Sequence, residues 1–264
     1  EEARRAYGRI VPRQAPGKRH LIMKQPIGVV AAIAPWNFPF ALAARKVAPA
    51  LAAGCPTILR PASQTPSCAV IFAEAVEEAK LPAGAFQLIA GPAQPIVQTF
   101  MDSPKCAKIT FTGSTEVGKK LVESSSKRLT KLSLELGGHA PVIVFGDADL
   151  DSAVEATAIT KFRNTGQSCI ASNRIYIERS IYEAFLERFV EKTKALKVGY
   201  GLEEGVQIGP LVNEDGLRTA LEHIEDAKQA GGRILCGGKK ADPGPGRPEQ
   251  GLFLEPTVIA DFPA

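Results

Sequence analysis

The feature that most constrains the fold is a repeated alternation of short β-branched runs with longer helical stretches. The helical stretches include residues 39–53 and 67–79, which are alanine-rich or amphipathic. Parallel strands have to be joined by long crossover connections, so this alternation predicts βαβ units and a parallel sheet. The expected strands are residues 27–33, 57–59, 86–89, 108–112, 131–135 and 142–145.

The segments before and after these predicted βαβ units show different sequence patterns. Residues 7–11 and 20–24 flank a turn that contains proline and glycine, which predicts a β-hairpin. We therefore expect a hairpin arm at 1–23, a first domain at 24–136 and the N-terminal part of a second at 137–264. Expected elements of the second domain are a helix at 151–163 capped by Asp149, a helix carrying Ile181, Phe185 and Phe189, strands at 233–236 and 257–260, and a loop at 242–251.

Charge and cysteine usage exclude several classes of protein. The net charge of +4 comes from 32 basic and 28 acidic residues spread along the chain, which favours neither nucleic-acid nor membrane binding. The five cysteines form no C-x-x-C pair, which indicates reduced thiols and a cytoplasmic location. The three histidines are scattered, so we expect no metal site. No charged start precedes an apolar stretch, so no signal peptide is expected.

Two residues are candidates for covalent chemistry. Cys169 follows a polar, glycine-containing run at 164–168, a setting that favours a reactive thiolate. Glu135 stands between Leu134 and Leu136 ahead of two glycines, so it is a candidate general base. The alternatives are ordinary ones, because most cysteines are small core residues and most glutamates are surface groups.

Two further motifs point to anion binding. Asn37, in the run Pro-Trp-Asn-Phe-Pro at 35–39, would suit a helix cap or a donor to a developing oxyanion. Gly113 and Ser114 lie between an expected strand and an expected helix, where backbone N–H groups can hold a pyrophosphate. The second motif alone is weak, because many α/β proteins contain such a turn.

These four motifs together resemble the aldehyde dehydrogenase superfamily, and the resemblance runs the length of the chain. It implies an α/β fold with a parallel Rossmann-type cofactor sheet and part of a second α/β catalytic domain. The chain starts without methionine and stops just after an expected strand, so we expect an internal fragment of a longer protein. The resemblance further implies that the hairpin is an oligomerisation arm and that the full-length parent is a homodimer or homotetramer.

The resemblance assigns the chemical roles. Cys169 would be the nucleophile, Asn37 and the Cys169 N–H would hold the oxyanion, and Glu135 would activate the water that cleaves the thioester. Family members with a redox disulfide carry a cysteine where this chain has Ala171, so no such switch is expected.

The resemblance also implies a nicotinamide cofactor, with NADP favoured over NAD. NAD-preferring members commonly have glutamate where this chain has Ser63, and the family usually has lysine where it has Arg60. Losing the carboxylate and gaining a guanidinium favour a 2′-phosphate, although Arg60 could equally be a neutral replacement. The cofactor residues implied are Pro35, Trp36, Asn37, Arg60, Ala62, Ser63, Gly91, Gly113, Ser114, Val117 and Leu136.

The substrate prediction depends on two arginines. Succinate-semialdehyde dehydrogenases carry arginine at the positions of Arg45 and Arg163, where the pair would bind the distal carboxylate with Cys169 at the aldehyde. Most arginines on helices are solvated surface groups, which is the alternative. The rival functions are oxidation of another aldehyde, such as glutarate semialdehyde or a hydrophobic one, and a catalytically silent binding or structural protein.

Overall fold

The computed structural model describes residues 2–242 and 251–261. The chain divides into two compact units, Glu1–Gly137 and Gly138–Ala264. Within the described residues, no helix is both long and apolar enough to cross a membrane. The loop expected at 242–251 lies almost entirely outside the described residues.

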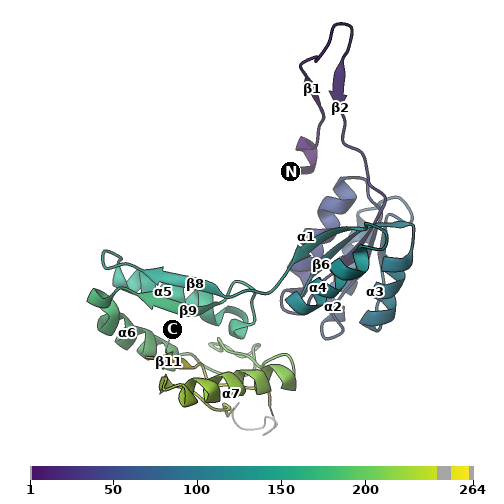
Figure 1. The fold of residues 1–264 in the computed structure, drawn as a ribbon. Helices are drawn as coiled ribbons and strands as arrows, with labels where there is room; N and C mark the ends of the chain where they lie inside the picture. Colours follow the sequence, from purple (N-terminus) through teal and green to yellow (C-terminus); the bar gives the residue numbers. More distant parts are fainter. Residues whose placement is uncertain (1, 243–250, 262–264) are drawn as a thin grey trace. The chain divides into compact units, whose positions relative to one another are not determined.

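The first unit is built on a five-stranded parallel sheet with the strand order β5-β4-β3-β6-β7. The chain moves outward from β3 through β4 to β5, and then returns to the other side of β3 with β6 and β7. Figure 1 labels β6 of this sheet among the helices that cover it. This strand order is the doubly wound arrangement of a Rossmann-type fold, and it confirms the α/β prediction. The strands are β3 (Val29–Ile33), β4 (Thr57–Arg60), β5 (Phe86–Leu88), β6 (Cys106–Thr112) and β7 (Lys131–Glu135).

Helices cover both faces of this sheet, so its central strand β3 is apolar throughout. Ala32 and Ala34 face one cluster, to which α1 (Pro39–Ala52) and α2 (Pro66–Glu78) contribute. Ala31 and Ile33 face the other, to which α3 (Ala93–Asp102) and α4 (Thr115–Ser125) contribute. Successive residues of a strand point to opposite faces, so continuous apolar runs are what a sheet covered on both sides requires.

The N-terminal segment forms the expected hairpin. A short 3-10 helix, Glu2–Arg5, precedes β1 (Arg9–Val11), which pairs antiparallel with β2 (His20–Ile22). Several large apolar side chains here are exposed, and these are Tyr7, Ile10, Leu21, Ile22 and Met23.

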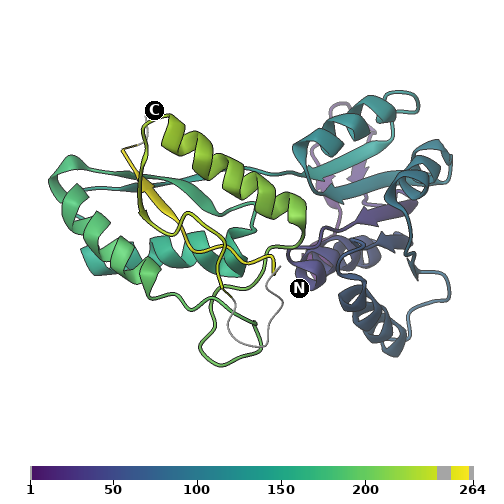
Figure 2. The same ribbon diagram turned by 90° about the horizontal axis from the view of Figure 1, so that it is seen from below.

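The second unit contains a parallel pair of strands and an antiparallel pair. β8 (Ala140–Val144) pairs in parallel with β9 (Ser172–Ile177), and β10 (Arg233–Cys236) pairs antiparallel with β11 (Val258–Ala260). The connecting helices are α5 (Leu150–Phe162) and α6 (Tyr182–Lys194), with short 3-10 turns at Arg163–Gly166 and Arg179–Ile181. Figure 2 shows the long helix α7 (Glu214–Gln229) beside the β10–β11 pair.

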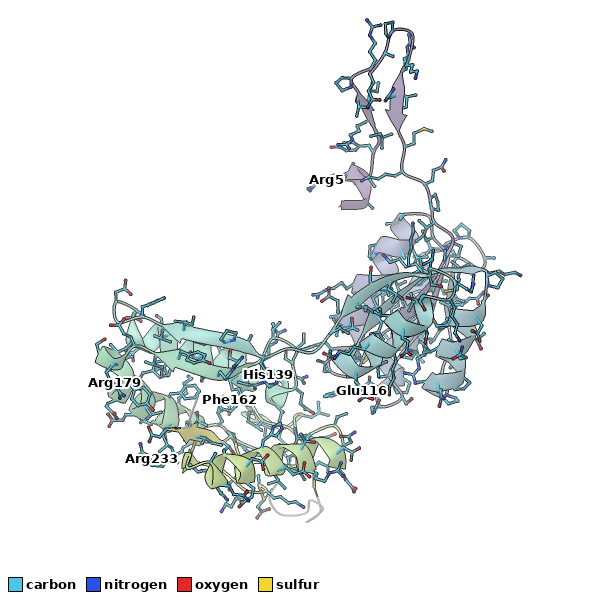
Figure 3. The ribbon with its side chains drawn as sticks, viewed as in Figure 1. Arg5, Glu116, His139, Phe162, Arg179 and Arg233 are labelled. Atoms are coloured by element: carbon cyan, nitrogen blue, oxygen red, sulfur yellow. The ribbon has the colours of Figure 1, made fainter. Side chains whose placement is uncertain are left out.

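The core of the second unit combines aliphatic side chains with stacked phenylalanines. Phe162, the last residue of α5, stacks on Phe189 with ring centroids 6.2 Å apart, and Phe185 stacks on Phe189 from within α6 at 5.7 Å. Phe162 is labelled in Figure 3. Phe185 and Phe189 are both buried, as the predicted helical spacing requires. Because Phe162 is held by this stacking, the 3-10 turn that begins at Arg163 leaves α5 from a fixed position.

Candidate active site

Three predicted site segments meet at the carboxyl edge of the first sheet. In the register of β3 and β6, Ile33 pairs with Phe111, so the segment after β3 that contains Asn37 emerges beside the segment after β6. On the far side of β6, Thr112 pairs with Glu135, and the Gly113 N–H donates to the Glu135 carbonyl at 3.1 Å. The direction of winding reverses between β3 and β6, and a doubly wound sheet binds its ligand at such a point.

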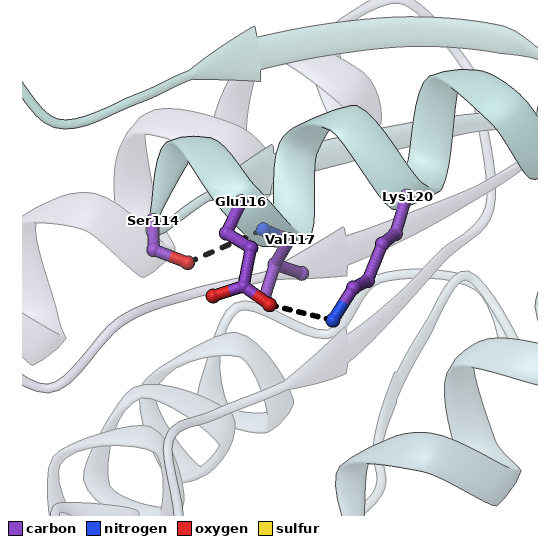
Figure 4. Close-up of polar contacts among 4 residues, drawn as sticks. All are labelled: Ser114, Glu116, Val117 and Lys120. Carbon is purple, nitrogen blue, oxygen red and sulfur yellow. Dashed lines mark hydrogen bonds and ion pairs between the residues drawn. The ribbon is translucent and has the colours of Figure 1, made fainter.

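The turn after β6 presents a helix N-terminus at this edge. Ser114 is the N-cap of α4, and its Oγ accepts a hydrogen bond from the Val117 N–H at 3.3 Å (Figure 4). Gly118 lets Leu136 pack closely on α4, because a Cβ at this position would lie 2.6 Å from Leu136 Cδ2 and the leucine would have to shift. The remaining N–H groups of the first turn and the positive end of the helix dipole suit a phosphate. The structure thus brings together Gly113, Ser114, Val117 and Leu136.

Asn37 is not the N-cap of α1, although its sequence position would have suited a helix cap; it lies one residue before the N-cap. The N-cap of α1 is Phe38, which makes no side-chain cap bond, and Pro39 occupies the first turn. The Asn37 Oδ1 instead accepts from the Phe38 N–H at 3.1 Å. Because this bond uses the acceptor end of the amide, it fixes the orientation of the donor end, Nδ2. Such orientation is what an oxyanion donor needs.

Arg60 ends β4 at the same edge and is 92% buried, since its exposed fraction is 8%. Its Nη2 donates to Ser63 Oγ and to the Gly91 carbonyl, both at 3.1 Å. Burial lowers the pKa of the guanidinium. The predicted residues Arg60, Ser63 and Gly91 are therefore in contact, and Ala62, in the loop that joins Arg60 to Ser63, is buried.

Buried polar atoms without partners indicate that this edge accepts a polar ligand. Among the described residues these atoms include Arg60 Nε and Thr112 Oγ1, at the ends of β4 and β6. Buried donors and hydroxyls are normally satisfied. A dinucleotide phosphate or ribose hydroxyl would satisfy them, so the residues present fit a nicotinamide dinucleotide.

The Glu135 side chain is exposed within the first unit, although it stands between two leucines. The reason is the position of β7 at the edge of the sheet, where side chains alternate between the covered face and solvent. Leu134 and Leu136 point to the covered face and pack against the core, so the glutamate between them points away.

A buried lysine that the sequence analysis missed lies within electrostatic reach of Glu135. Lys46 is 7% exposed on α1, and its Nζ donates to Thr110 Oγ1 at 3.4 Å. Burial lowers the pKa of Lys46 to about 8, while the negative charge of Glu135 raises it and the neighbouring Arg45 lowers it. The only sequence signal was a lysine at a helical position otherwise occupied by apolar residues.

Cys169 belongs to the second unit and is the one exposed thiol of the five. Cys106 and Cys236 have pKa values raised by burial, which makes their thiols poor nucleophiles. Cys169 lies in a turn before β9 and not at a helix N-terminus. Its setting is therefore a loop.

The backbone just before Cys169 is strained. Asn164, Thr165 and Gly166 have φ values of 54°, 59° and 73°, all in the left-handed region. Glycine and asparagine tolerate this region, whereas a β-branched threonine rarely enters it. Strain of this kind costs about 1–3 kcal/mol per residue and persists only where surrounding contacts enforce it.

The two candidate substrate arginines are both exposed, but they belong to different units. Arg45 lies on α1 of the first unit, and Arg163 begins the 3-10 turn after α5 in the second. Similarly, Asn37 and Glu135 belong to the first unit and Cys169 to the second.

The second unit also contains a polar chain that sequence reasoning missed. Lys161 Nζ donates to Asn173 Oδ1, and Asn173 Nδ2 lies 2.9 Å from His139 Nδ1. All three line a cavity of about 550 Å³, and His139 is labelled in Figure 3. Burial lowers the pKa of Lys161. Among the described residues no group of three or more His, Cys, Asp or Glu is placed to hold a metal ion.

Comparison with known proteins gives the family. A family model described as the aldehyde dehydrogenase family matches residues 1–264. The NADP(+) succinate-semialdehyde dehydrogenase GabD of Escherichia coli is 47% identical over 264 residues, and a glutarate-semialdehyde dehydrogenase of Pseudomonas putida is 47% identical over 263. A 3-sulfolactaldehyde dehydrogenase of Pseudomonas putida is also 47% identical, over 264 residues.

Solved structures agree with the sequence relatives. The crystal structure of an NADP-dependent enzyme from E. coli covers 99% of this chain with a TM-score of 0.95 at 46% identity. A succinate-semialdehyde dehydrogenase from Burkholderia pseudomallei covers 99% with a TM-score of 0.94 at 43% identity. The chain spans 53% of each of these structures and about half the length of the relatives named above.

Proposed function

Because this chain belongs to the aldehyde dehydrogenase family, we propose that the full-length protein oxidises an aldehyde to a carboxylic acid through a thioester on Cys169. The observation that carries the proposal is the setting of Cys169, the one exposed thiol of five, on a turn held in a strained conformation. An exposed cysteine on a backbone that is costly to maintain indicates a positioned nucleophile.

The residues of the chain account for each step. The Cys169 thiolate attacks the aldehyde carbon and forms a C–S bond, while Asn37 Nδ2 and the Cys169 N–H donate to the oxyanion. NADP, when bound, supplies the acceptor for the hydride that leaves this carbon. Glu135 then takes a proton from water, whose oxygen attacks the thioester, breaks the C–S bond and returns the thiolate. The product is the free acid.

The cofactor is proposed to be NADP, with NAD as the alternative. Ser114 and the first turn of α4 would hold the pyrophosphate, and Arg60 and Ser63 would face the adenine ribose and its 2′-phosphate. Pro35 and Trp36 would contact the nicotinamide end of the cofactor. A carboxylate at Ser63 would repel the phosphate, and none is present.

The substrate is proposed to be an aldehyde with an anionic group at its far end, succinate semialdehyde first and glutarate semialdehyde second. The names of the relatives support this class, because succinate, glutarate and sulfolactaldehyde all carry such a group. Arg45 and Arg163 are the exposed cations assigned to it. The exposed apolar side chains of the hairpin support a homodimer or homotetramer, and the reduced thiols support a cytoplasmic location.

Progress curves of NADPH formation by the full-length parent test the proposal. Succinate semialdehyde, glutarate semialdehyde and butyraldehyde should be compared. We expect the two semialdehydes, which carry a carboxylate, to be oxidised with a higher kcat/KM than butyraldehyde. Cys169→Ala should abolish turnover and leave NADP binding measurable, whereas Cys68→Ala is the matched control. Retention of turnover by Cys169→Ala would show that another residue is the nucleophile. Failure of every aldehyde with the wild-type protein would favour the silent binding protein.

A further inference from the structure

The left-handed turn before Cys169 needs an external support. Asn164, Thr165 and Gly166 are successive residues with positive φ, and threonine is disfavoured there. Within the turn, the Gln167 N–H donates to the Asn164 carbonyl at 3.0 Å, the Ser168 N–H donates to the Gly166 carbonyl at 2.9 Å, and Asn164 Nδ2 donates to the Gln167 carbonyl at 3.3 Å. Local hydrogen bonds of this kind also form in ordinary turns, so they do not by themselves select the left-handed form.

The support comes from a segment more than forty residues later in the chain. Thr165 Oγ1 accepts from the Gly209 N–H at 3.1 Å and donates to the Gly209 carbonyl at 3.4 Å. Gln167 Oε1 accepts from the Val212 N–H at 2.9 Å, and Gln167 Nε2 donates to the Pro210 carbonyl at 3.4 Å. Each side chain therefore both accepts from and donates to this backbone, as a neighbouring strand would.

That segment is itself anchored. Ile208 is 2% exposed, and its carbonyl accepts from the Gly199 N–H at 2.9 Å. The Leu211 N–H donates to the Leu252 carbonyl at 2.8 Å. Directly after Val212, Asn213 Oδ1 accepts from the Gly216 N–H at 2.9 Å and caps α7. Residues 208–212 are thus fixed on both sides of their contacts with the turn.

We propose that residues 208–212 act as a clamp that sets the position of Cys169, and that Thr165 and Gln167 are the positioning residues through which it acts. The inference rests on the proposed role of Cys169 as nucleophile. Gln167 is two residues before Cys169 and Thr165 is four before it, so a change in the turn moves the thiol directly. A nucleophile displaced by about 1 Å can lose about a hundredfold in rate.

The test uses substitutions that remove hydrogen bonds with little change in shape. Thr165→Val keeps the β-branched side chain and loses both bonds, whereas Thr165→Ser keeps the hydroxyl and should restore function. Gln167→Met probes the second pair of bonds separately, in case Thr165→Val fails to fold. The matched control is Thr160→Val, because Thr160 Oγ1 is exposed and bonds only within its own helix, to the Ala156 carbonyl at 2.7 Å.

Two readouts on the full-length parent separate positioning from general destabilisation. We expect kcat for succinate semialdehyde to fall about tenfold to a hundredfold in Thr165→Val and Gln167→Met, with KM within about twofold of wild type. Backbone hydrogen exchange in peptides covering 163–171 should become about tenfold faster, while peptides from α6 stay unchanged. Thr160→Val and Thr165→Ser should behave as wild type.

The proposal is overturned if exchange in 163–171 is unchanged, if it rises while kcat is retained, or if Thr160→Val loses as much activity. A wild-type protein that oxidises no aldehyde would remove the proposed function without removing the clamp. In that case the hydrogen-exchange comparison alone decides whether residues 208–212 hold the turn.

Discussion

Arg60 Nη2 donates a hydrogen bond to Ser63 Oγ at 3.1 Å, so the two residues from which a preference for NADP was predicted are in direct contact. The same Nη2 bonds the Gly91 carbonyl, whereas Nε is buried without a partner. The Arg60 guanidinium is therefore held at the end of β4, and its Nε is a buried donor that a bound ligand could satisfy.

The first prediction concerns cofactor choice. Ser63→Glu places a carboxylate beside Arg60, where it would pair with the guanidinium and repel a 2′-phosphate. We expect kcat/KM for NADP to fall by a factor that corresponds to about 2–3 kcal/mol of transition-state stabilisation. The kcat/KM for NAD should change little. Initial rates with both cofactors measure this, with Ser67→Glu, exposed at the start of α2, as the charge-matched control. An equal loss for both cofactors would show that Ser63 does not face the phosphate.

A second prediction follows from the burial of Lys46. Its pKa is about 8, and Glu135 raises it from what burial alone would give, so Glu135→Gln should lower the pKa further. A pH titration of ¹³C-labelled lysines by NMR measures the shift, with Lys46→Arg to assign the signal and Glu116→Gln as a control on α4. An unchanged Lys46 pKa in Glu135→Gln would show that the two charges are not coupled.

The lowered pKa of Lys46 also sets a pH dependence of stability. Between about pH 8 and 10.5 the unfolded chain binds more protons at this position than the folded one, so this residue makes stability rise with pH across that window. Below pH 8 the full cost of burying the charge is present. Lys46→Met should therefore stabilise the protein near pH 7 and flatten the rise, as urea unfolding at several pH values would show.

The third prediction separates the two halves of the reaction. Glu135→Gln should slow hydrolysis of the thioester far more than its formation, because the base acts after NADPH has formed. A stopped-flow trace should show a burst near one NADPH per active site, followed by a slow steady state. If both phases slow equally, Glu135 acts earlier in the reaction or only supports the structure.

The fourth prediction tests the substrate. A desolvated bond from Arg163 to a carboxylate is worth about 1.5–3 kcal/mol, so Arg163→Leu should lower kcat/KM for succinate semialdehyde about tenfold to a hundredfold. Butyraldehyde lacks the carboxylate and should be oxidised as well as before. A parallel decline for both aldehydes would mean that Arg163 supports the Cys169 turn instead.

Much of the fold could be predicted from local sequence patterns. Strands Lys131–Glu135 and Arg233–Cys236 begin and end where predicted, and Asp149 Oδ1 caps α5 by accepting from the Ser152 N–H at 2.8 Å. By contrast, β9 begins with polar residues and α7 is highly charged, so apolar periodicity alone found neither. Asn213 and the acidic residues after it were a usable start signal for α7.

Two features of the candidate site could not be predicted from local sequence patterns. The left-handed Thr165 opposes its own intrinsic preference, and its hydrogen bonds with Gly209 link it to a segment far along the chain. The exposure of Glu135 depends on β7 being an edge strand, which no property of its neighbours reveals. Both are consequences of tertiary structure, and sequence windows around either residue do not contain them.

If Cys169 is the nucleophile, it carries the acyl group between the two halves of the reaction, and that group can be trapped there. The full-length Glu135→Gln variant should be mixed with NADP and succinate semialdehyde, quenched with acid during the burst and analysed by peptide mass spectrometry. We expect a succinyl group on the peptide containing Cys169, lost on treatment with hydroxylamine and absent in Cys169→Ala. An NADPH burst without an acyl group on Cys169, or with the group on another cysteine, would contradict this role of Cys169.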